Sequence, residues 1–294
     1  MKRVESERNF MYEIPSKAFT HAGKFHADEV FATAVLRFLN PAMTVRRGFR
    51  VPEHFEGIVY DIGFGPFDHH QQNAEKRPNG VPYAAFGLIW REFGPRVLAA
   101  FMPPEALAEE AARFDEKFIQ HIDKDDNTGC GDILGDLIGT FNPCWDSEVS
   151  ADDCFAEAVA FAGTILTKRF ESLAAAVRAR NMAQQALARM EDGVVTMPAY
   201  APWKGVLVGS AAQFVVYPSQ RGGYSAQCVP RADQNHTLPY PFPAQWAGLS
   251  EEELPLASGI ATLRFCHNSR FLVTAGTLQD ALEACRKAKE AGLE

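Results

Sequence analysis

Histidines and carboxylates occur along this chain in four short groups whose side chains suit divalent metal ions. The first group lies in T-H-A-G-K-F-H-A-D-E and supplies His21, His26 and Asp28; Asp61 ends the run G-I-V-Y-D. The other two are Asp68, His69 and His70 in F-D-H-H-Q, and Asp123 with Asp125 and Asp126 in I-D-K-D-D-N. Imidazole and carboxylate together suit Mn²⁺, Zn²⁺, Fe²⁺ or Co²⁺, whereas an all-oxygen set suits Mg²⁺. With this mixture we favour Mn²⁺.

Each group also has an explanation without metal. A single aspartate at a strand end, such as Asp61, is more often a turn former or a helix cap than a ligand. The stretch D-K-D-D-N-T-G is compatible with a solvated loop, and His21 with an exposed turn. The non-metal explanation is weakest for Asp68, His69 and His70, because two adjacent histidines beside glycines have no obvious packing role. The ordered set of four groups favours a metal site over chance.

The elements around these groups predict an α/β fold. Val30, Phe31, Ala34, Val35, Phe38 and Leu39 recur at helical spacing, which predicts a helix over 27–39 that ends at Asn40-Pro41. Residues 57–63 read as a short buried strand whose end presents Asp61. Alternating strands and helices predict a doubly wound, mostly parallel sheet. Three of the four groups then fall on the rim where such sheets build their sites.

The pattern changes near residue 192. A long alanine-rich segment over 155–190 predicts one or two helices, and after it come strand-like runs such as F-V-V-Y-P. A strand pair around Asn268-Ser269 and a last helix over 278–291 complete this part. We therefore predict a catalytic domain over 1–192 and a second, smaller α+β domain over 193–294.

Composition limits the function classes. The 294 residues carry a net charge of −8, whereas a protein that holds duplex DNA by charge neutralisation is usually basic. The six cysteines form no C-x-x-C pair, so we expect reduced thiols in or near the core. No apolar run approaches the roughly 20 residues that span a bilayer, and M-K-R-V-E-S-E-R-N-F has no signal-peptide pattern. We expect a soluble, cytoplasmic protein without membrane association.

The ordered motifs resemble those of the DHH phosphoesterase superfamily, which includes RecJ-type exonucleases, nanoRNA phosphodiesterases and family II inorganic pyrophosphatases. Within it the chain is most similar to the melanocyte-proliferating-gene (MYG) family. The resemblance lies in T-H-A-G-K-F-H-A-D-E, V-Y-D-I-G, F-D-H-H-Q, A-F-G-L-I-W-R-E-F-G and F-I-Q-H-I-D-K-D-D-N, and continues in F-P-A-Q-W-A-G-L-S-E-E-E-L and F-C-H-N-S-R-F. Many superfamily members have aspartate where this chain and the MYG branch have His26. The imidazole favours a transition metal over Mg²⁺.

The resemblance implies a two-metal hydrolase and assigns the residues. His21, His26 and Asp61 would hold one cation; Asp28, Asp61, His69 and Asp123 would hold the second, with Asp61 bridging. Such a pair activates water for attack on phosphorus. His70 would contact the substrate or the leaving oxygen. Lys24 would help on the phosphate, although a solvated loop lysine is an equal reading.

In the second domain the resemblance implies substrate recognition by Arg221, His267 and Arg270, because arginine suits phosphate. A plain hairpin with its arginine in water is an equal reading. The function expected is a Mn²⁺-dependent phosphodiesterase, a 3′→5′ exonuclease on short RNA or single-stranded nucleic acid, and a homo-oligomer is compatible with it. Two alternatives remain: hydrolysis of pyrophosphate or a small nucleotide, and a metal-binding regulatory module without turnover.

Overall fold

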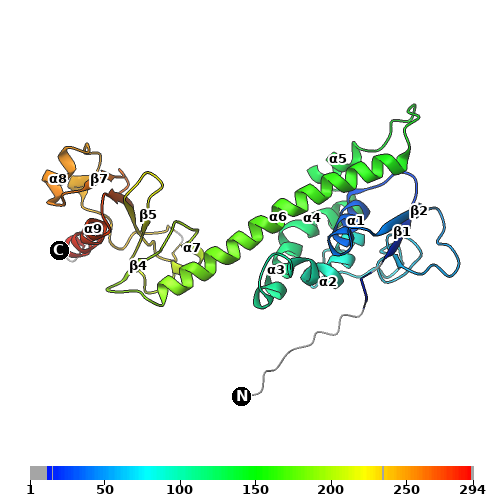
Figure 1. The fold of residues 1–294 in the computed structure, drawn as a ribbon, viewed down its shortest axis with the longest axis horizontal. Helices are drawn as coiled ribbons and strands as arrows, with labels where there is room; N and C mark the ends of the chain where they lie inside the picture. The colour runs from blue at the N-terminus through cyan, green and yellow to red at the C-terminus, as the bar shows by residue number, and fades with distance from the viewer. Residues whose placement is uncertain (1–11, 15, 234, 293–294) are drawn as a thin grey trace, which may run out of the picture. The chain divides into compact units, whose positions relative to one another are not determined.

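A computed structural model of the chain describes residues 12–14, 16–233 and 235–292 (Figure 1). The N-terminal residues used for the cytoplasmic prediction, 1–11, lie outside this range. The chain divides into two compact units, Met1–Ala174 and Ala175–Glu294, and we describe each by itself. The described residues include no helix long and apolar enough to cross a membrane.

The first unit is built on a parallel sheet with strand order β2-β1-β3. Strand β1 (Lys17–His21) pairs in parallel with β2 (Thr44–Gly48) on one side and with β3 (Ile58–Val59) on the other. Beyond β3, Tyr60 forms one further parallel bridge to Phe67. The carboxyl ends of these strands therefore meet at one edge, where His21 and Asp61 lie. The α/β class is confirmed, and the doubly wound arrangement stays a prediction.

The helices of this unit bury one aromatic core. Helix α1 (Ala27–Leu39) has the predicted bounds and packs against α2 (Ala85–Leu98), where the rings of Phe31 and Phe86 stack with centroids 5.3 Å apart. In the sequence, the pair Gly94-Pro95 predicts the end of this second helix. The structure corrects this, because the helix continues through Pro95 and the N–H of Ala99 bonds to the Pro95 carbonyl.

One helical segment changes its winding before the I-D-K-D-D-N motif. The 3₁₀ turn η1 (Pro104–Ala106) leads into α3 (Leu107–Phe114), then into the π-helical turn η2 (Asp115–Ile119), and then into α4 (Gln120–Thr128). Gly129, at φ +61°, closes α4 in the left-handed conformation that glycine adopts without cost. Helix α5 (Ile133–Gly139) follows. Single-turn π-bulges are frequent at functional sites.

The long helix α6 (Ala151–Leu187) is continuous, and the division between the units falls inside it. The domain boundary at residue 192 stays a prediction. Three cysteines are buried as expected, Cys228, Cys266 and Cys285. Cys130 and Cys144 are exposed, which corrects the expectation for them, because both lie in polar loops that flank α5.

The second unit contains a mixed sheet of order β4-β5-β6-β8-β7. Its strands are β4 (Val194–Thr196), β5 (Phe214–Pro218), β6 (Tyr224–Cys228), β7 (Leu263–Cys266) and β8 (Leu272–Ala275). Short helical segments lie between them: α7 (Lys204–Leu207), η3 (Ala244–Trp246) and α8 (Glu253–Ser258). Helix α9 (Leu278–Ala291) has the predicted bounds and buries Ala281, Ala284 and Ala288 against the sheet.

Candidate metal centre

Five segments of the first unit bring the predicted groups to one edge of the sheet. His21 ends β1, and His26 precedes the first turn of α1, which contains Asp28 and Glu29. Asp61 follows β3, and Asp68, His69 and His70 come next along the chain. Helix α4 adds Asp126. Because parallel strands end at the same edge, this clustering is a consequence of the topology.

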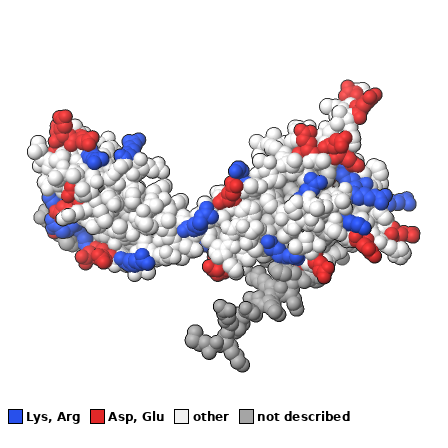
Figure 2. Space-filling view, viewed as in Figure 1, with Lys and Arg blue, Asp and Glu red and all other residues white. Residues whose placement is uncertain are grey.

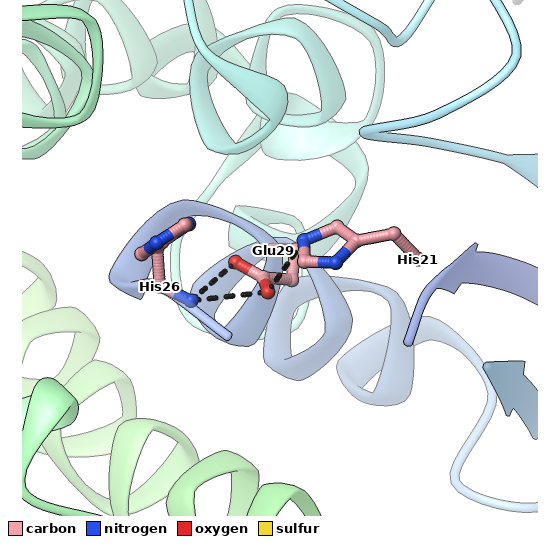
Figure 3. Close-up of side chains that lie close together, drawn as sticks. All are labelled: His21, His26 and Glu29. Carbon is pink, nitrogen blue, oxygen red and sulfur yellow. Dashed lines mark hydrogen bonds and ion pairs between the residues drawn. The ribbon is translucent and has the colours of Figure 1, made fainter. Parts of the chain in front are cut away.

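Glu29 joins the two histidines of the first motif (Figure 3). Its Oε1 lies 2.9 Å from His21 Nε2. The backbone N–H of His26 donates to both Glu29 oxygens at 3.0 and 2.9 Å. Glu29 is fully buried and was not among the predicted ligands. The sequence signal for it is its place three residues after the cap, where a glutamate reaches back to the cap N–H.

Asp61 lies between two histidines. Its Oδ2 is 3.1 Å from His21 Nε2, and its Oδ1 is 3.1 Å from His69 Nε2. The side chain is almost fully buried. The backbone has φ +56°, a left-handed conformation that aspartate tolerates better than most residues, and its N–H donates to the Phe67 carbonyl at 3.0 Å. This geometry turns the carboxylate toward both imidazoles at once.

A third set of ligand atoms comes from α1 and α4. Asp126 Oδ2 lies 3.2 Å from His69 Nε2, and its Oδ1 lies 3.9 Å from His26 Nδ1. Asp28 Oδ2 lies 3.8 Å from His69 Nε2 and accepts from the N–H of Ala85 at 3.2 Å. His26, Asp28 and Asp126 each offer one ligand atom within 4.8 Å of the others.

Asp123, the predicted ligand from this helix, is engaged elsewhere. Its Oδ2 accepts from Arg77 Nη2 at 2.8 Å, and its Oδ1 accepts from the N–H of Gly87 at 3.1 Å. Arg77 is also paired with Asp115 in the π-turn η2. The structure therefore does not bring Asp123 into the histidine cluster, and Asp126, one turn later in α4, occupies that place.

Asp68 organises the segment around His70. Its Oδ1 accepts from the backbone N–H of His70 at 3.1 Å and lies 2.7 Å from His70 Nδ1. Its Oδ2 accepts from the N–H of Phe64 at 2.6 Å. The His70 side chain is 56% exposed, so its second ring nitrogen is free to meet a substrate. Asp68 itself is buried, which makes it an orienting group.

Several of the candidate ligands line one open cavity of about 570 Å³, whereas the fully buried Asp28 and Glu29 do not. Its lining consists of His21, His26, Asp61, Ile62, Gly63, Phe64, Asp68, His69, His70, Asp126 and Asn127. Lys24 is exposed and does not line this cavity. His70 lines the cavity and Lys24 does not, and the roles predicted for both residues stay predictions.

Charge in this cluster is poorly balanced without a cation. Burial alone would lower the pKa of His21, but hydrogen bonds to Asp61 and Glu29 outweigh it and raise that pKa to about 10. The pKa of His69 is raised to about 9, because its bond to Asp61 outweighs burial in the same way. Burial and the neighbouring charges of Asp61, Asp126 and Glu29 raise the pKa of Asp28 well above its ordinary value.

These residues fit a divalent cation. Asp28, Glu29 and Asp61 are all buried, and each offers one oxygen within 4.8 Å of the others. Three carboxylates at such distances repel one another unless protons or metal ions neutralise them. Asp28 Oδ1 is buried without a hydrogen-bond partner, although buried carboxylate oxygens normally have one. A bound cation would satisfy that oxygen and relieve the repulsion.

The predicted residues of the second unit are only partly together. Arg221 and His267 line a separate cavity of about 710 Å³, together with Arg264, Tyr200 and Tyr217 among others. Arg270 does not line it. It lies in the turn between β7 and β8 at φ +58°, where its N–H donates to the His267 carbonyl at 2.7 Å. The substrate role of these three residues stays a prediction.

Comparison with known proteins gives consistent matches over most of the chain. The model of the MYG1_exonuc family, described as "Uncharacterised protein family (UPF0160)", matches residues 17–288. A MYG1 protein of Schizosaccharomyces pombe is 28% identical over 316 residues, covering 92% of this chain and 97% of that protein. The MYG1 exonuclease of Homo sapiens is 28% identical over 322 residues, covering 92% and 85%. A MYG1 protein of Chlamydia pneumoniae is 27% identical over 301 residues, covering 94% and 96%. No solved structure matches.

Proposed function

Because the chain belongs to the MYG1_exonuc family, we propose that it is a metal-dependent phosphodiesterase that shortens RNA or single-stranded nucleic acid from an end. Several curated relatives are named MYG1 exonuclease. The observation that carries the proposal is the position of Asp61, whose two oxygens each lie 3.1 Å from a different histidine. In this position Asp61 would belong to both sets of metal ligands, and divalent cations held there would supply an activated water.

We assign the ligands in two sets that share Asp61. His21, His26 and Asp61 would form the first set, and Glu29 would join it, because Glu29 offers one ligand atom within 4.8 Å of those of His21 and His26. Asp28, Asp61, His69 and Asp126 form the second, with Asp126 in place of the predicted Asp123. Mn²⁺ suits this mixture of imidazole and carboxylate. Bound divalent cations supply a water of lowered pKa and neutralise charge on the phosphoryl oxygens.

The chain's own groups then position the substrate. His70, oriented by Asp68, meets the phosphate or the leaving oxygen from the exposed side of the cavity. Asp61 keeps both histidines turned inward. Basic and acidic side chains lie in separate groups on the face of each unit in view (Figure 2). That distribution and the charge of −8 favour a short, single-stranded substrate over a long duplex.

The test is hydrolysis of an RNA oligomer in Mn²⁺ by the wild-type chain and by Asp61→Asn. We expect the variant to lose at least about 100-fold in kcat, since it cannot bridge two cations. Oligomers labelled at the 5′ or the 3′ end would decide the polarity, for which we propose 3′→5′. Equal release of nucleotides by both proteins contradicts the proposal. Faster phosphate release from pyrophosphate than nucleotide release from RNA would assign a different substrate.

A further inference from the structure

Phe64 places a bare phenyl ring at the edge of the metal cavity. It is 72% exposed, and among the described residues lining the cavity it is the one aromatic side chain besides the histidines. Phe67, three residues later in the same loop, is 4% exposed and packs near Phe93 with ring centroids 6.0 Å apart. The loop therefore has an anchoring phenylalanine inside and a second one directed outward.

The backbone holds Phe64 in a conformation that bulky residues avoid. Its φ is +57°, in the left-handed region where a side chain with a Cβ is strained. The hydrogen bond from its N–H to the buried carboxylate of Asp68, at 2.6 Å, fixes it there. Gly63, at φ +88°, brings the loop close to Val51, where a Cβ would lie 2.9 Å from the valine Cγ2. Strain of this kind concentrates at functional sites.

The same carboxylate positions two different groups. Asp68 holds His70 through one oxygen and Phe64 through the other. Asp68 therefore fixes the position of the His70 imidazole, which would meet the phosphate, relative to the exposed ring of Phe64. A phenyl ring offers no hydrogen bond or charge to a phosphate, but it stacks on any nucleobase.

We propose that Phe64 is a substrate-binding residue that stacks on the nucleobase next to the phosphate being cleaved. This rests on the proposed function and names the part of the substrate that the metal cavity recognises. Stacking tolerates every base, so Phe64 would distinguish nucleic acid from pyrophosphate and other base-free phosphates without reading sequence.

The kinetic test compares Phe64→Leu, Phe64→Trp and wild type on a short RNA and on the same RNA lacking the base beside the scissile phosphate. Loss of one base–aromatic stack predicts a KM about 5- to 150-fold higher for Phe64→Leu on the intact RNA. On the abasic RNA its KM should equal that of wild type, and Phe64→Trp should retain the wild-type KM on both. Phe49→Leu is the matched control: Phe49 is 80% exposed but does not line the cavity, so no change is expected. An equal effect of Phe64→Leu on both RNAs, or of Phe49→Leu on the intact RNA, overturns the proposal.

A binding measurement separates this inference from the proposed function. A non-hydrolysable dinucleotide that carries 2-aminopurine should lose fluorescence on binding to wild type in Mn²⁺ and keep it with Phe64→Leu. If wild type cleaves no RNA, the proposed function fails, while quenching that depends on Phe64 still supports the stacking role. Quenching that is absent in wild type, or unchanged in Phe64→Leu, overturns it.

Discussion

At the scale of single residues, Asp123 and Asp126 lie one turn apart in helix α4, and only Asp126 lies beside the histidines. Asp126 lies 3.2 Å from His69, whereas Asp123 is buried against Arg77. Burial raises the pKa of Asp123 to about 7, although the charge of Arg77 opposes the rise. The two residues are chemically identical, so the difference in their surroundings makes Asp126, rather than Asp123, the candidate metal ligand.

We expect the same substitution to affect metal affinity at Asp126 and stability at Asp123. Asp126→Asn should weaken Mn²⁺ affinity by at least about tenfold and leave the melting temperature of the metal-free protein nearly unchanged. Asp123→Asn should lower the free energy of unfolding by about 1.5–3 kcal/mol, because Arg77 loses a charged partner, and should leave Mn²⁺ affinity nearly unchanged. Metal titration by calorimetry and urea unfolding measure the two quantities. The reverse pattern would restore Asp123 as the ligand.

At the scale of elements, the buried ion pair between Asp123 and Arg77 depends on how closely α2 approaches α4. Gly87 in α2 donates its N–H to Asp123, and a Cβ at Gly87 would lie 2.0 Å from Asp123 Oδ2 and 2.4 Å from Arg77 Nη2. The absence of a side chain therefore allows the buried ion pair to form. Gly163, in α6, has open space where its Cβ would lie.

Alanine at the two glycines should change stability in opposite directions. Gly87→Ala should lower the free energy of unfolding by about 1–3 kcal/mol, since the clash with a buried ion pair exceeds the gain in helix propensity. Gly163→Ala should raise it by about 0.4–1 kcal/mol, because alanine reduces the entropy of the unfolded chain without meeting a neighbour. Thermal or urea unfolding of the two variants compares them directly. Equal destabilisation by the two variants would mean that α2 and its neighbours leave more room for a Cβ at Gly87 than the structure shows.

Several elements agree with their sequence pattern and one does not. Helices α1 and α9 have the predicted bounds, because an apolar stripe with a clear end signal defines each of them locally. The segment from Pro103 contains a π-helical turn that its apolar spacing did not reveal. Of the apolar residues whose spacing predicts a shared helix face in this segment, Ala111, Phe114, Phe118 and Ile122 are buried and Leu107 is partly buried. Winding depends on tertiary packing, which periodicity does not encode.

At the scale of the whole molecule, the metal cluster links stability to pH. Below pH 6.5, the ordinary pKa of histidine, both His21 and His69 are protonated whether the chain is folded or not. Their folded pKa values are raised to about 10 and about 9, so the paired imidazolium ions stabilise the fold fully below pH 6.5. That stabilisation is lost as pH rises through 9 and 10.

The free energy of unfolding of the metal-free protein, kept in chelator, should therefore fall between pH 7 and 9. In Asp61→Asn the fall should be smaller than in wild type, because both histidines lose the carboxylate that raises their pKa values. Mn²⁺ requires deprotonated imidazoles, so the stabilisation it adds should be larger at pH 8.5 than at pH 7. Urea unfolding under argon, with chelator or with Mn²⁺, measures both effects. A stability that rises from pH 7 to 9 in chelator would contradict the assigned hydrogen bonds.

The sequence by itself determined the kinds of groups at the centre, the α/β class and the family, because motif order, periodicity and residue type are local properties of the chain. It also gave a correct place for His21, Asp61 and His69, since each ends or follows a strand of one parallel sheet. The tertiary structure alone decided that Asp126, rather than Asp123, lies beside His69, and that Phe64 stays exposed beside the cavity. The first of these depends on a contact between distant segments, Arg77 with Asp123 across 46 positions, which local spacing cannot specify.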